Sequence, residues 1–122
     1  MKLRLIAAFV LSLTAGAVHA EPQAPTPLKC ETGPANRQFG GTDWLVYSCD
    51  DGRSMVVISS SGNPASPFYF VLTPVNGAYK IYGEGNGSQS ASDAAGAELS
   101  HMKQEDLADL LAETKLKSSA PN

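Results

Sequence analysis

The chain has 122 residues, of which 43% are hydrophobic and only 17% are charged, and its formal net charge at pH 7 is −3. This composition excludes a strongly basic nucleic-acid-binding protein, a coiled coil and a large multidomain enzyme. It is typical of a small globular protein with one core.

Residues 1–20 have the pattern of a secretory signal peptide. Lys2 and Arg4 precede an apolar run that ends at Leu13, and small residues lead to Ala20. The run is shorter than the roughly 20 residues that a membrane-spanning helix needs. We therefore expect cleavage near Ala20, a periplasmic or secreted protein, and no stable membrane insertion; an uncleaved anchor is the alternative.

Loss of Lys2 and Arg4 with the signal peptide changes the net charge from −3 to −5. Binding to nucleic acid or to anionic lipid depends on Lys and Arg, so an acidic chain favours neither. We expect no nucleic-acid partner.

Residues 21–29 contain three prolines, and we expect them to form a flexible leader. We expect one domain over residues 30–117 and a frayed tail at 118–122. Cys30 and Cys49 should form a disulfide, since an exported chain with two cysteines normally oxidises them; a redox or metal pair is the alternative. In the chain-entropy model, a disulfide that closes this loop stabilises the folded state by about 3 kcal/mol. The segment from Cys30 to Gly41 is rich in Gly, Pro and Asn, which predicts a loop.

Two β-hairpins are expected next. Strands at 44–49 and 53–59 flank Asp51-Gly52, and strands at 68–73 and 78–83 flank Asn76-Gly77; both dipeptides are typical of type I′ turns. The first turn places Tyr47 opposite Val56, and Leu45 opposite Ile58.

These registers also predict which residues share a face. In the first hairpin, one face holds Trp44, Val46, Met55 and Val57. In the second, one face holds Phe68, Phe70, Leu72, Tyr79 and Ile81, and the other holds Tyr69, Val71, Thr73, Lys80 and Tyr82.

The glycine-rich segment 83–90 should be the most flexible internal part of the chain. A short helix follows from Ser90 to Ala95, because Ser90 and Asp93 have capping-box spacing. The spacing of Leu107, Leu110 and Leu111 predicts a longer helix over 103–116.

The predicted fold class is α+β: a small four-stranded, mostly antiparallel sheet of two hairpins, with a C-terminal helix packed on one face and one disulfide. Leu107, Leu110 and Leu111 should pack on the second hairpin at Phe68, Phe70, Leu72 and Ile81. One long helix covers one sheet face. The other face must be wet, closed into a barrel or bound by a partner, and we expect it to include some of Trp44, Val46, Val57, Tyr69, Val71 and Tyr82.

No catalytic, metal or cofactor site is expected. His101 is the only histidine after residue 20, no serine lies in a G-x-S-x-G motif, and Asp50 and Asp51 are accounted for by a turn. The sequence lacks the ligand spacing of calcium or zinc sites. These observations favour a protein that is not an enzyme.

The run from Tyr47 to Arg53 resembles the Tyr-x-Cys-Asp-Asp-Gly stretch of the bacterial inhibitors of c-type lysozyme, which are small exported β-proteins. The resemblance covers about seven residues. It implies an inhibitor that acts in the cell envelope, and it assigns no inhibitory residue in this chain.

We expect a non-catalytic module that binds an envelope protein, in the narrower case an inhibitor or immunity protein, and that is a monomer or a homodimer. The candidate binding residues are Trp44, Tyr69, Tyr82, Glu84 and Asn86. The alternative is a structural or stress-related envelope protein without a dedicated partner.

Overall fold

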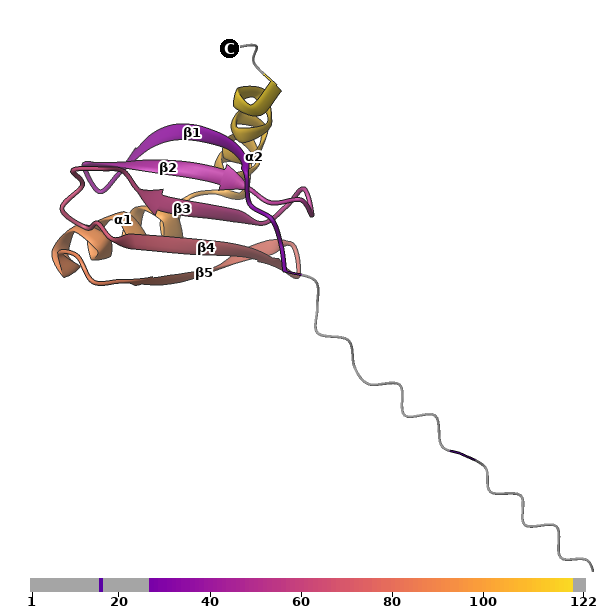
Figure 1. The fold of residues 1–122 in the computed structure, drawn as a ribbon, viewed down its shortest axis with the longest axis horizontal. Helices are drawn as coiled ribbons and strands as arrows, with labels where there is room; N and C mark the ends of the chain where they lie inside the picture. Colours follow the sequence, from indigo (N-terminus) through magenta and orange to yellow (C-terminus); the bar gives the residue numbers. More distant parts are fainter. Residues whose placement is uncertain (1–15, 17–26, 120–122) are drawn as a thin grey trace, which may run out of the picture.

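The structure is a computed structural model that describes residue 16 and residues 27–119. The predicted signal peptide, apart from Gly16, most of the leader and residues 120–122 lie outside the described residues. Five strands precede two helices along the chain (Figure 1). They are β1 (Thr32–Phe39), β2 (Thr42–Ser48), β3 (Met55–Ser59), β4 (Phe68–Val75), β5 (Ala78–Gly85), α1 (Gln89–His101) and α2 (Gln104–Ser119).

The α+β class and the disulfide are confirmed, but the sheet has five strands instead of four. The extra strand is β1, in the segment that was predicted to be a loop. The alternation of apolar and polar residues in β1 is weak because the strand lies at the sheet edge, where only Ala35 and Phe39 are buried apolar residues. Gly40 and Gly41 join it to β2 with φ values of 60° and 77°, as a type I′ turn requires.

The strands form an antiparallel meander in the order β1-β2-β3-β4-β5. Within the described chain, β1 and β5 each pair on one side only, so the sheet is open and not closed into a barrel.

The predicted pairings Tyr47–Val56 and Leu45–Ile58 are confirmed. The turn between β2 and β3, however, is not a two-residue type I′ turn. Cys49 N–H donates to the Ser54 carbonyl at 2.9 Å, which leaves a four-residue loop, and Gly52 is its only residue with positive φ. The predicted register is still correct because a two-residue turn and this four-residue loop place the same residues opposite each other. The Asn76-Gly77 turn has φ values of 50° and 79°, as predicted.

Both helices lie against the same face of the sheet (Figure 1). Helix α1 is longer than the expected short helix, and its N-cap is Ser88, whose hydroxyl accepts from Ala91 N–H at 3.4 Å, rather than a box built on Ser90. Helix α2 packs chiefly on β1 and β2 and not on the second hairpin. The missed strand β1 explains this error, because it extends the covered face to the side where α2 lies.

Trp44 is central to the core between sheet and helices. Its ring has no exposed surface and lies 6.3 Å from the Phe68 ring, edge to face, and 5.3 Å from the Phe70 ring. Its indole N–H reaches the Thr42 hydroxyl at 2.9 Å, so the burial leaves no unsatisfied donor. Leu99, Leu107 and Leu110 supply the helix side of this core.

Candidate functional site

The sheet face turned away from both helices carries two cross-strand rows of largely apolar side chains. Residues in each row are successive pairing partners from β2 to β5. One row is Tyr47, Val56, Val71 and Tyr82; the other is Leu45, Ile58, Tyr69 and Glu84. We call these residues, without Glu84, the open face.

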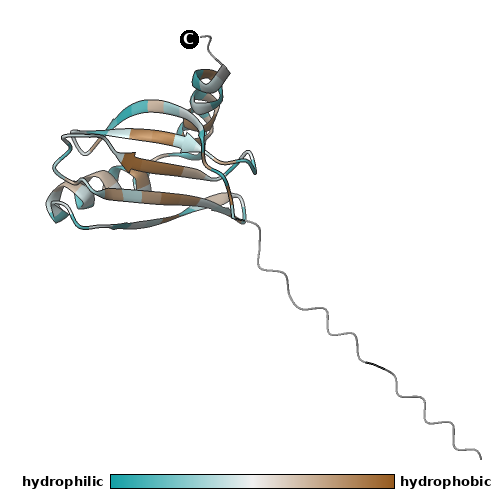
Figure 2. Ribbon diagram, viewed as in Figure 1, coloured by the Kyte–Doolittle hydropathy of each residue, from teal (hydrophilic) through white to brown (hydrophobic). Residues whose placement is uncertain are grey.

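The central strands are apolar at consecutive positions, which makes both of their faces apolar. Figure 2 shows hydrophobic stretches in β2, β3 and β4. The described helices cover only one face, so Ile58, Tyr69 and Tyr82 retain 39%, 38% and 59% of their surface exposed. A contiguous exposed apolar patch of this kind is characteristic of interaction sites.

The sequence interpretation assigned some residues to the wrong face. Trp44, Val46 and Val57 were expected among the uncovered residues, but all three are fully buried beneath the helices. Trp44 is therefore unavailable to a partner and leaves the candidate binding set. The faces of each hairpin were predicted correctly; their relative phase depends on β3–β4 pairing, which places Val57 opposite Phe70.

Glu84 is the charged residue at the end of the second row. Its Oε2 accepts hydrogen bonds from the Tyr69 hydroxyl at 2.9 Å and the Tyr82 hydroxyl at 3.3 Å. The hydrogen bond to this carboxylate, and then its negative charge, raise the pKa of Tyr69 above its ordinary value of 10.0. The three side chains therefore form a polar cluster at the border of the open face.

A groove with a volume of about 590 Å³ begins at this cluster. Its walls include Ile58, Pro67, Phe68 and Tyr69, and Glu84 and Asn86 lie at its polar side. Tyr69, Glu84 and Asn86 thus line one groove, and Tyr82 joins them through its bond to Glu84. The structure brings these four predicted residues together.

The glycine-rich segment 83–90, which was predicted to be flexible, makes backbone hydrogen bonds to the segment 64–67. Asn86 N–H donates to the Pro67 carbonyl at 3.0 Å, and Ser88 N–H donates to the Pro64 carbonyl at 2.8 Å. A Cβ atom at Gly87 would lie 2.0 Å from the Ala65 carbonyl oxygen. Glycine is needed here for close approach of two backbones, next to Ser66 and Asn86, which line the groove.

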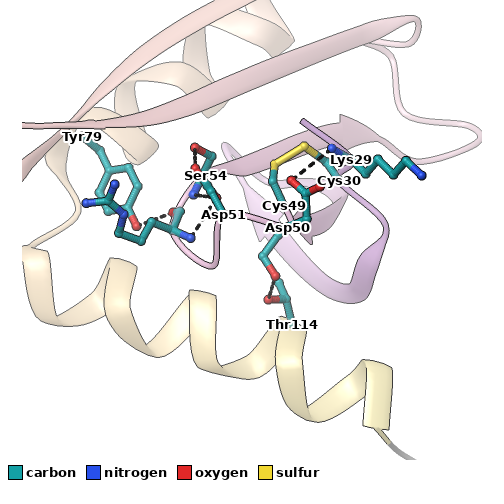
Figure 3. Close-up of a disulfide and its surroundings, with 10 residues drawn as sticks. Lys29, Cys30, Cys49, Asp50, Asp51, Ser54, Tyr79 and Thr114 are labelled. Atoms are coloured by element: carbon teal, nitrogen blue, oxygen red, sulfur yellow. Dashed lines mark hydrogen bonds between the residues drawn. A yellow bond between two sulfur atoms is a disulfide. The ribbon is translucent and has the colours of Figure 1, made fainter. Parts of the chain in front are cut away.

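The motif that resembles the lysozyme inhibitors lies at the opposite end of the sheet from the groove. Figure 3 shows this motif around the disulfide. Cys30 and Cys49 form the predicted disulfide, and Asp50 exchanges backbone and side-chain hydrogen bonds with Lys29. Asp51 accepts from the Ser54 hydroxyl at 2.6 Å and from two backbone amides.

Slight burial alone would raise the pKa of Asp51. The hydrogen bonds from Ser54 and the Arg53 amide, together with the Arg53 charge, outweigh this and hold the pKa below its ordinary value of 3.8. The carboxylate therefore stabilises the loop as an anion.

His101 lies at the C-terminal end of α1, where its Nδ1 is 2.6 Å from the Ala97 carbonyl. No group of three or more His, Cys, Asp or Glu residues suited to a metal ion occurs among residues 27–119. Within the same residues, neither helix is long and apolar enough to cross a membrane.

Sequence logic could have found the residues it missed. Leu45, Tyr47, Val56 and Ile58 share a face in the predicted register, and the opposite face carries Trp44, the largest apolar side chain and the one that gains most from burial. Comparison with known proteins adds no further residues: no family model, curated protein or solved structure matches this chain.

Proposed function

We propose that this chain is an exported, non-catalytic module of the bacterial envelope that binds another protein through the open face. The observation that carries the proposal is the pair of uncovered cross-strand rows in a sheet whose described helices both lie on the other side. Exported function rests on the signal-peptide pattern of residues 1–20. If the partner is an envelope enzyme, the chain acts as an inhibitor or immunity protein.

The size of the sheet fits a modest protein interface. Strands of five to eight residues, at about 3.3 Å per residue and about 4.8 Å between strands, make a face of roughly 20 by 20 Å. This is about half of the roughly 800 Å² that one partner contributes to a standard interface. The groove beside Glu84 and the strand ends supply the remaining contact area.

The aromatic content of the face also suits a protein partner. Tyr69 and Tyr82 combine a large apolar ring with a hydroxyl group, and tyrosine is enriched where interfaces concentrate their binding energy. Both rings are already oriented by bonds to Glu84, so less side-chain entropy is lost on binding.

The test is cross-linking capture from envelope extract with the oxidised protein as bait, followed by calorimetry between the bait and the purified captured protein. The double variant Ile58→Ser, Tyr82→Ser removes apolar surface from the open face. Leu116→Ser removes an apolar side chain that is 72% exposed on α2 and serves as the matched control.

We expect at least a tenfold loss of affinity in the double variant and unchanged affinity in Leu116→Ser. Equal affinity of all three proteins would place the binding surface elsewhere. If nothing is captured and sedimentation shows a well-folded monomer, the alternative of an envelope protein without a dedicated partner is favoured.

A further inference from the structure

The groove beside Glu84 has a chemical character that the rest of the open face lacks. Its walls are mostly apolar and aromatic, from Ile58, Pro67 and Phe68, and one carboxylate stands at its side. A volume of about 590 Å³ lies within the range of about 300 to 1,000 Å³ that is typical of ligand-binding clefts.

The carboxylate is oriented but not neutralised by the described chain. Both phenol hydroxyls bind Oε2, and neither an ion pair nor any other hydrogen bond joins the Glu84 carboxylate to residues 27–119. The cation nearest along β5 is Lys80, four residues away, or about 13 Å at the rise of an extended strand. Glu84 Oε1 therefore has no hydrogen-bond partner among residues 27–119.

We propose that this groove is the anchor site for an arginine side chain of the protein partner. The inference rests on the proposed function and specifies the chemistry of its partner. The arginine stem packs along the apolar wall, and the guanidinium donates to Glu84 while lying against the Tyr69 and Tyr82 rings.

Arginine fits this site better than lysine does. A planar guanidinium can stack on an aromatic ring and donate to a carboxylate through two N–H groups, whereas an ammonium is a compact and strongly hydrated point charge. The net charge of −3 of the whole chain also favours a basic partner surface.

The groove is formed before any partner arrives. Hydrogen bonds from Asn86 to Pro67 and from Ser88 to Pro64 fix the two segments that make its wall. The phenol groups fix the carboxylate in the same way, so the site loses little conformational freedom when it is occupied.

The test uses the oxidised, ¹⁵N-labelled protein without the predicted signal peptide, residues 1–20. This protein is titrated with the peptide acetyl-Gly-Arg-Gly-amide. The matched ligand is the same peptide with citrulline, which keeps the shape of arginine without its charge. We expect amide shifts at Tyr69, Glu84 and Asn86 with the arginine peptide, and at least tenfold weaker binding of the citrulline peptide.

Two variants separate the groove from general charge effects. Glu84→Gln still accepts from the phenols and should weaken arginine-peptide binding at least tenfold. Glu105→Gln removes an exposed charge on α2 and should leave binding unchanged. Equal binding of the two peptides, shifts confined to other residues, or full binding by Glu84→Gln would each overturn the assignment; the peptide pair decides it even if a variant folds poorly.

The outcomes also separate this inference from the proposed function. If Ile58→Ser, Tyr82→Ser loses the captured protein while the arginine peptide does not bind, the open face stands and the arginine site falls. If the arginine peptide binds at Glu84 but the captured protein binds the double variant with unchanged affinity, the arginine site is supported and the proposed function is contradicted.

Discussion

The two faces of the sheet are built from the same strands and are similarly apolar in β2 to β4, yet only one of them is packed. On the covered face, Trp44, Val57 and Leu72 have no exposed surface, whereas on the open face Ile58 and Tyr82 keep 39% and 59% of theirs. Burial, and not residue type, therefore divides the side chains that hold the fold from those available to a partner.

Alanine substitution of one aromatic residue from each face gives the largest predicted contrast. Trp44→Ala removes a fully buried ring and should reduce the free energy of unfolding by about 3 to 5 kcal/mol. Tyr82→Ala removes one member of an exposed cross-strand pair and should cost less than about 1 kcal/mol. Guanidinium unfolding of the oxidised proteins measures both values.

A large cost for Tyr82→Ala would break the comparison. It would mean that the open face is packed in solution, with a second copy of the chain as the simplest cover. Sedimentation of the unmodified protein at two concentrations distinguishes this case from an isolated monomer.

The segment beside the groove provides the next contrast, between a glycine in contact with backbone atoms and one that faces a side chain. Gly87→Ala would place Cβ 2.0 Å from a carbonyl oxygen of Ala65, and we expect a loss of about 1 to 3 kcal/mol. Gly96→Ala in α1 approaches only the Phe70 ring, with its nearest atom at 3.2 Å, and should change stability by less than about 1 kcal/mol. Thermal unfolding of both variants tests the difference.

If Gly87→Ala were neutral, the segment 83–90 would yield easily, and the sequence interpretation of a flexible connection would regain support. The prediction of flexibility rests on composition alone. Glycine serves both flexible chains and close backbone contacts, and only the position of Ala65, more than twenty residues earlier in the chain, decides between them.

Local signals predicted the pairings within the hairpins well. Alternation and turn residues define the register of a hairpin, so Tyr47–Val56 and the Asn76-Gly77 turn were correct. Edge strand β1 was missed because its outward residues, such as Asn36 and Gln38, are polar and its inward apolar residues are few. Its Gly40-Gly41 turn was the available signal.

Long-range pairing limited the prediction of the candidate site. Tyr69, Tyr82, Glu84 and Asn86 come from adjacent strands of one hairpin and its exit, and their association follows from that register. Trp44 was misplaced because its face depends on how β3 meets β4 and on where α2 packs. The large apolar ring of Trp44 was the one local signal that favoured burial of its face.

A buried polar pair on the covered face gives a smaller effect. The hydroxyls of Ser48 in β2 and Thr114 in α2 are 2.7 Å apart, and both residues are almost fully buried. Thr114→Val keeps the shape but leaves the Ser48 hydroxyl without this partner, and it should cost about 1 to 2 kcal/mol.

The double variant Ser48→Ala, Thr114→Val removes both hydroxyls and should recover part of that loss. Chemical unfolding of the single and double variants provides the measurement. Fully additive losses would show that the two hydroxyls do not depend on each other.

The smallest predicted effect compares two tyrosines on opposite faces. On the open face, the hydrogen bond that Tyr69 donates to Glu84, and then the Glu84 charge, raise the pKa of Tyr69. On the covered face, burial is the first cause that raises the pKa of Tyr79, followed by the charge of Asp51, with Arg53 opposing. Glu84→Gln should therefore lower the pKa of Tyr69 toward 10.0 and leave that of Tyr79 unchanged, as followed by NMR titration of ¹³C-labelled tyrosine rings.

The same shifts set the direction of the alkaline response. A tyrosine whose pKa is raised by folding contributes stability that is complete below the unfolded pKa of about 10 and is lost as pH rises through the folded pKa. In Glu84→Gln, the part of this alkaline loss that comes from Tyr69 should shrink, while the part from Tyr79 remains. Equal movement of both pKa values would show that Glu84 acts across the whole sheet, and the two faces would then be electrostatically coupled instead of separate.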